Sequence, residues 1–583
     1  MKKKFLYFFQ IFFTILILIP NQSLADSNTI TSDSSTQQDI DGDGEFLTVK
    51  DNSTLATGAT TKAANVTGDS VDVTVESGST ISANTVAVFG DDTSDLTVTN
   101  SGTITASGTT AIDVKGTTDA TITNSSGGTI SSNRNTIRIS KTGSNNTTGM
   151  TITNSGTITA SNNGSAIFAS DSNSTATITN KIGGEITNSD TSNATIRTGA
   201  SSTIVNSGTI KNDIDNDAIK LYGNNATITL KDGGIVVGKI DGLLRTGSKL
   251  KFNHGVGQGY FYETEGDFTL EDLDGNQVVK GSAGSVGQGG NENIDELLGY
   301  KSLNIRKSLN KFLKSEGFKN KKTEWQGIQA TSLERKEHTK NLALGYEFYS
   351  LGVNIIRPLE NENVIASFEY SEQDFNKDHD ITRYNILFGV HLNESENKFK
   401  DNSFILAGAT LNEGERKILT NTTSSGTLNI TDTYESFEIH TGKMFQNKSL
   451  LPNIGTNLSY SFTPSHTESK YYSWEDKHVA NFSLDLNDEY NIENKKSKSK
   501  FGIGWILDYR TLITDSKTEY SINGTKATYY QDDDLTKEMT LSVNINYEKK
   551  FYKFGKILIS IDGKSTTQEV NSIGANISFI KAL

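Results

Sequence analysis

The segment "TITNSGTITA" (151–160) occurs almost unchanged at two other places in the chain. A near copy, "TVTNSGTITA", stands at 97–106, and "TIVNSGTI" stands at 203–210. Apolar residues alternate with polar ones in each copy, a period of two that is typical of a β-strand. The Ser-Gly pair between two such runs is a turn signal. A strand–turn–strand phrase that recurs in this way predicts a stack of similar coils.

An asparagine marks the same place in each repeat. Successive asparagines are 24, 30, 26 and 26 residues apart, and they are Asn100, Asn124, Asn154, Asn180 and Asn206. Repeats of this length indicate a solenoid. A third apolar run, such as "TIRIS" (136–140), follows in most repeats, so each turn of chain holds three short strands. We therefore expect a right-handed parallel β-helix in which these asparagines form a hydrogen-bonded ladder along the stack.

Weaker copies extend this frame in both directions. "TVESGSTI" would place Glu76 in the asparagine column, "TVKDNSTL" would place Lys50 there, and "TITLKDGGI" would place Leu230 there. The loop "KTGSNNTTGM" (141–150) is expected to account for the longest interval. Disorder is the alternative for a segment this rich in Ser, Thr, Asn and Gly. Isoleucines at a fixed register argue against disorder.

The N-terminus has the pattern of an export signal. Three lysines (2–4) precede the apolar run "FLYFFQIFFTILILI" (5–19), and Ser23-Leu24-Ala25 supplies small residues for cleavage before Asp26. An uncleaved membrane anchor is the alternative, although the apolar run is short for a span. The chain has no cysteine, which suits a protein threaded unfolded through a pore, and its net charge of −14 argues against a nucleic-acid partner.

Beyond residue 320 the sequence predicts long strands with one apolar and one polar face. "FGIGWILDY" (501–509), "MTLSVNINY" (539–547) and "YNILFGVHL" (384–392) alternate almost without exception. Alternation over about ten residues, with aromatic residues near the ends, is typical of an outer-membrane β-barrel. The twelve predicted strands are 324–333, 346–357, 363–374, 381–392, 402–412, 435–446, 452–463, 478–489, 500–510, 537–548, 555–564 and 570–582.

Alternation also assigns residues to the two faces of this barrel. We expect the lipid-facing positions to include Phe388, Trp505, Leu541, Val543 and Ile577. The acidic or titratable residues expected in the lumen are Glu369, His391, Glu438, Asp485 and Asp508. A register error of one residue would reverse every assignment.

A Gly-rich joint, "GSAGSVGQGG" (281–290), precedes a predicted helix at 293–315. Its apolar stripe runs from Ile294 to Phe312, and its other faces are basic. We expect it to lie inside the barrel as a pore plug, with its stripe packed on Leu387, Ile506 and Ile365; a solvated spacer is the alternative. The basic residues of this plug are Lys301, Arg306, Lys307, Lys311 and Lys314.

A signal peptide, an "NSGTI"-rich β-helix, a linker helix and a twelve-strand barrel together resemble the monomeric autotransporter family. In that family the barrel inserts in the outer membrane and the passenger domain is exported to the cell surface. The last strand resembles the family's barrel-assembly signal through the residues of one parity, which are Ile573, Ala575, Ile577, Phe579 and Leu583. This sequence ends in Leu583 where the family usually ends in Phe or Trp, and it has Lys581 where an aromatic residue is common.

The resemblance implies an all-β chain with a defined domain order. The expected domains are a signal peptide (1–25), a β-helical passenger (26–280), a joint and linker helix (281–320) and a β-barrel translocator (321–583). It also implies a Gram-negative outer membrane as the location, with the passenger at the cell surface or released. The expected partners are outer-membrane lipid, the secretion and barrel-assembly machinery in transit, and a surface ligand, with the chain as a monomer.

Two acidic clusters are the candidates for chemistry. Asp39, Asp41 and Asp43 have the first spacings of a calcium loop, but position 12 is Lys50 rather than a bidentate Glu. Asp213, Asp215 and Asp217 would share one face of an extended segment, as in polysaccharide lyases and hydrolases built on β-helices. Solvated polar turns are the alternative for both clusters.

The passenger offers no other catalytic pattern. His254 is its single histidine, and neither "GDSGG" nor G-x-S-x-G occurs. The leading hypothesis is therefore a non-enzymatic surface protein without cofactors that acts in adhesion or cell–cell contact. The alternative hypothesis is a surface enzyme that degrades polysaccharides through Asp213, Asp215 and Asp217.

Overall fold

The computed structural model describes residues 27–58, 61–190, 192–279, 281–287, 294–314, 323–337, 345–359, 362–375, 379–392, 402–445, 452–515, 517–530, 536–551 and 555–582. The chain divides into two compact units, Met1–His254 with Tyr262–Leu273 and Thr420–Thr427, and Gly255–Phe261 with Asp274–Leu419 and Leu428–Leu583. The expected signal peptide (1–25) lies outside the described residues. Among the described residues, no helix has both the length and the apolar character needed to cross a membrane.

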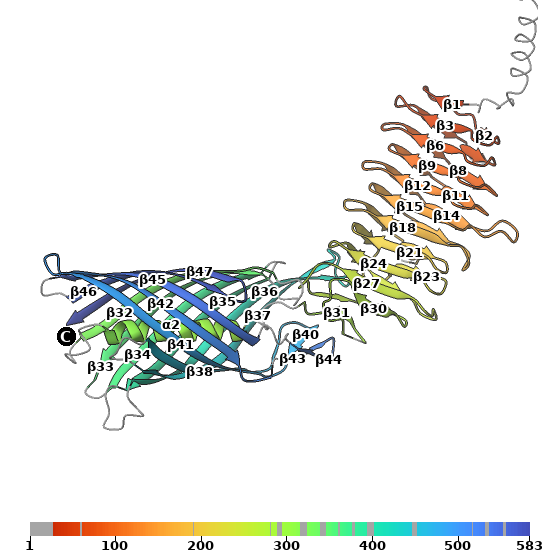
Figure 1. Cartoon of the computed structure of the whole chain (residues 1–583). Helices are drawn as coiled ribbons and strands as arrows, with labels where there is room; N and C mark the ends of the chain where they lie inside the picture. Colours follow the sequence, from red (N-terminus) through yellow and green to blue (C-terminus); the bar gives the residue numbers. More distant parts are fainter. Residues whose placement is uncertain are drawn as a thin grey trace, which may run out of the picture. The chain divides into compact units, whose positions relative to one another are not determined.

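The first unit is a parallel β-solenoid of three sheets, seen in Figure 1 as a stack of coils. Sheet A holds β1 (Ser27–Ile30), β3 (Phe46–Val49), β6 (Asp72–Val75), β9 (Thr97–Asn100), β12 (Thr121–Asn124), β15 (Met150–Asn154), β18 (Ala176–Asn180), β21 (Thr203–Asn206), β24 (Thr227–Lys231), β27 (Lys249–Asn253) and β30 (Thr269–Asp272). Sheet B holds β4 (Thr54–Thr57), β7 (Thr80–Ala83), β10 (Thr103–Ala106), β13 (Thr129–Ser132), β16 (Thr157–Ala160), β19 (Glu185–Asn188), β22 (Thr209–Lys211) and β25 (Ile235–Val237).

Sheet C completes each coil. It holds β2 (Gln38–Ile40), β5 (Ala64–Val66), β8 (Val86–Asp91), β11 (Thr110–Lys115), β14 (Ile137–Ser140), β17 (Ile167–Ala169), β20 (Ile196–Thr198), β23 (Asp217–Leu221), β26 (Lys239–Asp241) and β29 (Thr264–Glu265). The three strands per repeat expected from the sequence are therefore present.

The repeated phrase forms two strands that bury every second residue. In β15 and β16, Ile152 and Ile158 are fully buried, whereas Thr153 and Thr157 are partly exposed. Ile152 lies beside the equivalent isoleucines of the coils before and after it, Ile122 and Ile178. One coil cannot bury its few apolar side chains alone, so stacking supplies the core.

The outer copies of the repeat differ from the sequence prediction by one residue. Val75, not Glu76, pairs with Asn100, and Val49 occupies the next position of the column instead of Lys50. The cause is the alternation itself, because Val73 and Val75 must both point inward and Glu76 then falls in the turn. Leu230 continues the column beside Asn206, as expected.

The second unit contains a closed antiparallel barrel of twelve strands. They are β32 (Thr323–Arg335), β33 (Tyr346–Pro358), β34 (Glu362–Phe375), β35 (His379–Leu392), β36 (Ser403–Thr420), β37 (Thr427–Phe445), β38 (Asn453–Thr463), β41 (Lys477–Asn494), β42 (Ser499–Leu512), β45 (Lys537–Phe551), β46 (Gly555–Thr566) and β47 (Val570–Ala582). The first and last strands pair along their whole length and close the ring. All twelve predicted strands are confirmed.

The two ends of the barrel differ. At the end where β32 begins and β47 ends, which we name the terminal end, described connections such as 495–498 are short. At the opposite end, which we name the loop end, some strands extend further and the connections form an additional sheet. The predicted strands 402–412 and 435–446 are longer at this end in the structure, because β36 extends to Thr420 and β37 begins at Thr427. The additional sheet holds β39 (His466–Thr467), β40 (Tyr472–Trp474), β43 (Lys517–Ile522) and β44 (Thr525–Tyr530).

Candidate functional site

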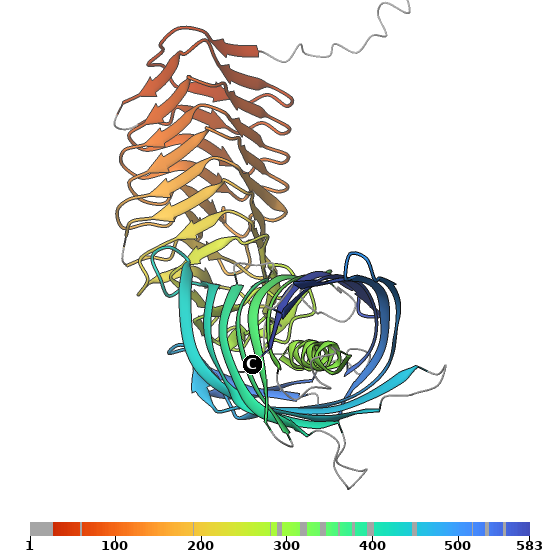
Figure 2. The ribbon, with the colours of Figure 1, turned by 90° about the vertical axis from the view of Figure 1, so that its left-hand side faces the viewer.

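A single helix, α2 (Ile294–Lys314), lies inside the ring of barrel strands, as the end-on view in Figure 2 shows. Its residues contact β38, β41 and β42 of the wall. Glu296, near its start, bonds Arg335 at the loop end of β32, and Phe312, near its end, packs in one cluster with Trp325 at the terminal end. The helix therefore runs from the loop end to the terminal end.

Arg306 anchors the middle of α2 to the barrel wall. Its Nη2 donates to Asp508 Oδ1 at 2.7 Å and to Ser483 Oγ at 3.1 Å, and its Nη1 binds Asp485. Both aspartates face the lumen, as the alternation predicted, and all three charged side chains are at most 5% exposed. A planar guanidinium is suited to such a pair of carboxylates because it presents several N–H groups in a fixed fork.

The lysines of α2 form further links to the wall. Lys301 Nζ binds both carboxylate oxygens of Glu438 at 2.8 and 2.9 Å. Lys307 Nζ donates to Ser542 Oγ at 2.9 Å and to Asp562 Oδ2 at 3.1 Å. Lys311 Nζ donates to Ser560 Oγ at 2.5 Å. The side chain of Lys314, the fifth basic residue of the predicted plug, lies outside the described residues.

A buried polar network holds the start of the helix at the loop end. The Glu296 carboxylate accepts from Arg335 Nη1 at 2.7 Å, Tyr300 OH at 2.9 Å and Tyr346 OH at 3.1 Å. Tyr300 OH is also 2.7 Å from Glu538 Oε1, and Arg510 donates to the other oxygen of that carboxylate. Alternation alone identified none of these pairings, because their members lie far apart in sequence.

An apolar cluster, which we name the collar, lies along one side of the last three turns of α2. The four helix residues that enter it, Ile305, Leu309, Phe312 and Leu313, are at most 8% exposed. The wall residues of the collar are Trp325, Ile356, Ile365, Leu387, Phe404, Leu406, Met444 and Ile580. The stripe was expected to pack on Leu387, Ile365 and Ile506; the first two do so, whereas Ile506 is not in the cluster. The lumen is therefore apolar on one side near the terminal end, whereas Lys311 contacts Ser560 on another side.

The chain segment before α2 is bound by the additional sheet at the loop end. Tyr472 OH donates to the carbonyls of Tyr260 and Ser285, and Tyr520 OH donates to Gln277 Oε1. Arg416 Nη1 donates to the carbonyl of Val286 at 2.5 Å. The apolar residues beneath this sheet include Phe261, Ile418, Ile430, Trp474 and Ile522. The additional sheet therefore lies at the end of the barrel at which α2 begins.

The outside of the barrel carries an apolar belt between two rows of aromatic residues. Phe388, Trp505, Leu541, Val543 and Ile577, the expected lipid-facing residues, are all well exposed. Tyrosines near the loop end are Tyr349, Tyr370, Tyr384 and Tyr509, and aromatic residues near the terminal end are Phe445, Phe501, Tyr547, Phe551 and Phe579. His391, Glu438, Asp485 and Asp508 are buried in the lumen, and Glu369 lines a small cavity there with Lys301. This belt is the lipid-facing surface of a transmembrane barrel.

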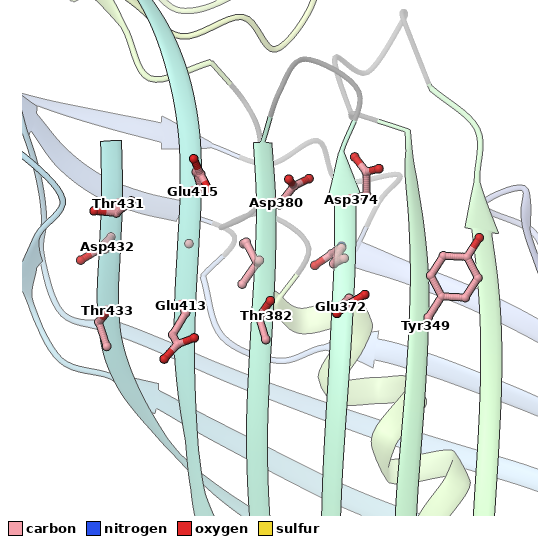
Figure 3. Close-up of a pocket in the computed structure, with 13 residues that line it drawn as sticks. Tyr349, Glu372, Asp374, Asp380, Thr382, Glu413, Glu415, Thr431, Asp432 and Thr433 are labelled. Atoms are coloured by element: carbon pink, nitrogen blue, oxygen red, sulfur yellow. The ribbon is translucent and has the colours of Figure 1, made fainter. Parts of the chain in front are cut away.

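An acidic hollow of about 600 Å³ lies beyond the tyrosine row on the outer face. Figure 3 shows Glu372, Asp374, Asp380, Glu413 and Glu415 along neighbouring strand ends. Among the residues that the structure describes, no group of three His, Cys, Asp or Glu side chains is placed to hold a metal ion. The hollow marks where the outer surface changes from apolar to charged.

The asparagine ladder runs through the solenoid core. Asn100, Asn124, Asn154 and Asn180 each donate from Nδ2 to Oδ1 of the next asparagine, at 2.8, 2.8, 2.9 and 2.9 Å, and the ladder ends at Asn206. All five side chains are fully buried. The column stays unbroken beside the longest interval, because residues 141–149 form a loop outside the sheets before β15 begins.

Neither acidic cluster of the solenoid converges on a site. Asp39 accepts from Asn65 and Gln37, whose hydrogen bonds lower its pKa, and Asp43 accepts from the amide of Asp69. Asp213 and Asp215 are exposed on a turn. Asp217 pairs with Lys220 at 2.9 Å. The sequence spacing did not predict that the aspartates of one cluster have different partners, because the backbone of each turn sets the orientation of each side chain.

The last strand lies where the ring closes. Ile573, Ala575, Ile577 and Phe579 of β47 all face outward, while the residues between them are buried. Leu583, the fifth residue of the expected barrel-assembly signal, lies outside the described residues. His254, the single histidine of the solenoid, is buried and lies 3.1 Å from Tyr262 OH.

No protein-family model matches the chain, and no curated protein sequence matches it. Solved structures with a similar fold include the translocator domain of the autotransporter NalP from Neisseria meningitidis (8% identity, 49% of this chain, 97% of that chain, TM-score 0.34). Others are the beta domain of the Bordetella autotransporter Brka (8%, 44% and 98%, TM-score 0.30) and the transport unit of the autotransporter AIDA-I from Escherichia coli (10%, 49% and 98%, TM-score 0.27).

Proposed function

We propose that this chain, which has the solenoid, luminal helix and twelve-strand barrel of an autotransporter, is anchored by its barrel in the outer membrane of a Gram-negative bacterium. The barrel displays the solenoid at the cell surface, where it acts without catalysis in adhesion or cell–cell contact. The observation that carries the proposal is the direction of α2 through the lumen.

The direction of α2 fixes the side to which the preceding chain is delivered. The helix begins at the loop end and finishes at the terminal end, where β32 starts and β47 stops. In barrels of this class, short turns face the periplasm and long loops face outward. Chain that precedes Ile294 therefore leaves the lumen on the outer side, and this chain includes the whole solenoid.

The fit of α2 supports a barrel that is closed after export. The helix is charge-paired to the wall through Arg306 and Lys301 and packs against the collar through Phe312. Two small cavities of about 30 and 40 Å³ remain beside it, each enough for a few water molecules at most. These contacts hold the helix in the lumen and support a low conductance after export.

The surface of the solenoid supports binding rather than catalysis. Asp213 and Asp215 are solvated, and Lys220 neutralises Asp217, so these carboxylates lack the shared cleft that acid–base catalysis needs. The ring of His254 is buried in the interior, where it is stacked beside Tyr262. Repeated threonine columns on sheets A and B give broad polar faces suited to contact with another surface.

Protease treatment of intact cells tests the topology. Cells that express the full chain should lose the solenoid and retain an outer-membrane fragment that begins near residue 290. Protection of the entire chain in intact cells, with cleavage only after lysis, would place the solenoid inside and overturn the proposal. A matched strain that expresses the chain without residues 27–254 should lose adhesion and cell–cell contact, and equal adhesion by both strains would refute the adhesive role.

A further inference from the structure

Sheet C carries an outward column that differs from those of sheets A and B. The outward positions of sheet A in the middle coils are nearly all threonine, such as Thr121, Thr151 and Thr177. In sheet C the pairing of neighbouring strands aligns charged and aromatic residues instead. The six middle members of this column are Phe89, Asp113, Arg138, Phe168, Arg197 and Lys220.

At one end of this column, two arginines stack on aromatic rings that neighbouring coils contribute. The Arg197 guanidinium carbon lies 3.7 Å from the ring centre of Tyr222 and 4.9 Å from that of Phe168. The guanidinium carbon of Arg245, one coil beyond Tyr222, lies 5.4 Å from the ring centre of the same Tyr222. We name Phe168, Arg197, Tyr222 and Arg245 the arginine stack. Rings on both sides hold the Arg197 guanidinium in place, so little conformational entropy remains to be lost on binding.

The cations of the column differ in their partners. Arg138 is paired with Asp113, and Lys220 with Asp217 and Asp241. Within the part of the chain that the structure describes, Arg197 and Arg245 form no ion pair with a carboxylate. Arg197 Nε is buried without a hydrogen-bond partner, although the side chain as a whole is only half-buried. A half-buried guanidinium without a counter-ion favours an external anion, because charge-assisted hydrogen bonds are about twice as strong as neutral ones.

We infer that the arginine stack binds an acidic polysaccharide, whose carboxylate or sulfate groups contact Arg197 and Arg245. The inference deepens the proposed adhesive function and rests on it for its biological role. Coils are spaced at about 4.8 Å, so two arginines two coils apart are separated by roughly 10 Å along the solenoid. This distance suits a polymer with one charge on every second sugar.

A nucleic acid fits this face poorly. Double-stranded DNA carries one negative charge per roughly 1.7 Å of its axis and needs a continuous basic stripe. Here both Asp217 and Asp241 lie beside Lys220; Asp217 is in the coil between those of Arg197 and Arg245, and Asp241 is in the coil of Arg245. A polymer with widely spaced charges avoids these carboxylates, whereas closely spaced phosphates would meet them.

The test measures binding of the full chain, purified in detergent, to immobilised polysaccharides. The probes are hyaluronan, which has one carboxylate on every second sugar, polygalacturonate, which has one on every sugar, and neutral dextran. R197M should weaken binding to at least one acidic polymer about tenfold or more, as expected for loss of a charge-assisted hydrogen bond. R197K keeps the charge but not the planar fork and should fall between R197M and the unchanged protein.

The matched control is R134M, which removes the same charge from an exposed position of the solenoid. It should change binding less than about twofold. Equal losses in R134M and R197M would show non-specific charge attraction, and no binding to either acidic polymer would also overturn the inference. Preferential binding to DNA, or to vesicles that contain anionic lipid, would assign the stack to a different partner and refute the polysaccharide. Far-UV circular dichroism checks that each variant keeps its solenoid.

Cell assays separate this inference from the proposed function. If cells adhere through the solenoid but R197M cells adhere equally well, the adhesive function stands and the arginine stack is not its site. If the purified chain binds the polysaccharide through Arg197 but cells that display it do not adhere, the site stands and the adhesive function is wrong.

Discussion

Arg306 of α2 and Asp508 of β42, which are 202 residues apart in sequence, form a buried ion pair with 2.7 Å between Nη2 and Oδ1. The same guanidinium binds Asp485 on the neighbouring strand. Asp485 and Asp508 lie opposite each other on paired strands, and their carboxylates would repel each other without a cation. Arg306 neutralises both. The presence of α2 in the lumen and the charge balance of the wall depend on each other.

Replacement of Arg306 should destabilise the closed barrel. R306M leaves Asp485 and Asp508 buried without their cation, a change that typically costs roughly 3–5 kcal/mol. We expect the barrel to unfold at a lower temperature, measured as the change in its mobility on gel electrophoresis after heating. We also expect more frequent open states in planar bilayers. The triple variant R306M/D485N/D508N removes the charges together and should recover most of the lost stability. If R306M alone behaved like the unchanged protein, the ion pair would contribute nothing to closure.

Removal of α2 should open a channel. A chain without residues 294–314 loses the charge pairs of Lys301 and Arg306 and the apolar contacts of Phe312, and its lumen then fills with water. The expected result is a large, steady conductance in planar bilayers, where the full chain is nearly closed. A control that exchanges the half-buried Asn310, which lines a small cavity beside the helix, for Ser should stay closed. Equal conductance with and without the helix would show that it does not seal the pore.

Strict alternation made the barrel and the solenoid predictable from the sequence. A period of two assigns each residue to a face wherever one face is buried, which is why Val543 and Asp508 were placed correctly. The same rule failed at Glu76, where only the packing of Val73 and Val75 sets the register. A weak repeat carries too little information to locate a turn to the residue.

The features formed by tertiary packing were beyond the sequence. The collar contains Trp325, Phe404 and Ile580, and a rule that expects polar residues in the lumen gives no reason to bring them together. The arginine stack combines Arg197 with Tyr222 only because the strands of sheet C align in space. The Glu296 network joins residues from α2, β32 and β33, and no local pattern encodes these contacts.

An asparagine in the interior of the ladder should contribute more to the stability of the solenoid than the asparagine at its end. N154A removes donors to Asn180 Oδ1 and to the carbonyls of Gly156 and Glu185. Each buried polar atom left without a partner costs roughly 1–3 kcal/mol, so urea unfolding of the solenoid should shift clearly to lower concentration. N100V should cost less, because Asn100 lies next to Val75 and its Oδ1 already lacks a partner within the described residues. Equal losses from both variants would contradict the cooperative ladder.

The lipid-facing register can be tested at two adjacent positions. Val543 faces outward in the middle of β45, and V543R should hinder insertion by roughly 2–4 kcal/mol if it lies near the midplane. Asn544 faces a small polar cavity in the lumen that Asp488, Glu489 and Asp562 also line, so the same change there, N544R, places its cation near carboxylates and should be tolerated. The measurement is the fraction of protein that reaches the folded, outer-membrane form. The opposite ranking of the two variants would invert the register of the strand.

The additional sheet at the loop end, which contains His466, should be more stable in acid than at neutral or higher pH. Its Nε2 lies 3.2 Å from Asp432 Oδ2 and its Nδ1 lies 3.1 Å from the carbonyl of Pro464, so both ring nitrogens face acceptors. Only the doubly protonated ring can donate at both positions. Burial alone would lower the pKa of His466, but the hydrogen bonds to Asp432 and Pro464 outweigh it and raise the pKa above its ordinary value.

A raised pKa in the folded state fixes the sign of the pH dependence. The stabilisation is fully present below the unfolded value of about 6.5 and is lost as the pH rises through the folded pKa. Hydrogen exchange of residues 464–474, corrected for the intrinsic rate at each pH, should therefore show more protection at about pH 5 than at about pH 8. H466Q should abolish this difference, whereas the control H478Q should retain it. A difference that persists unchanged in H466Q would assign it to another group.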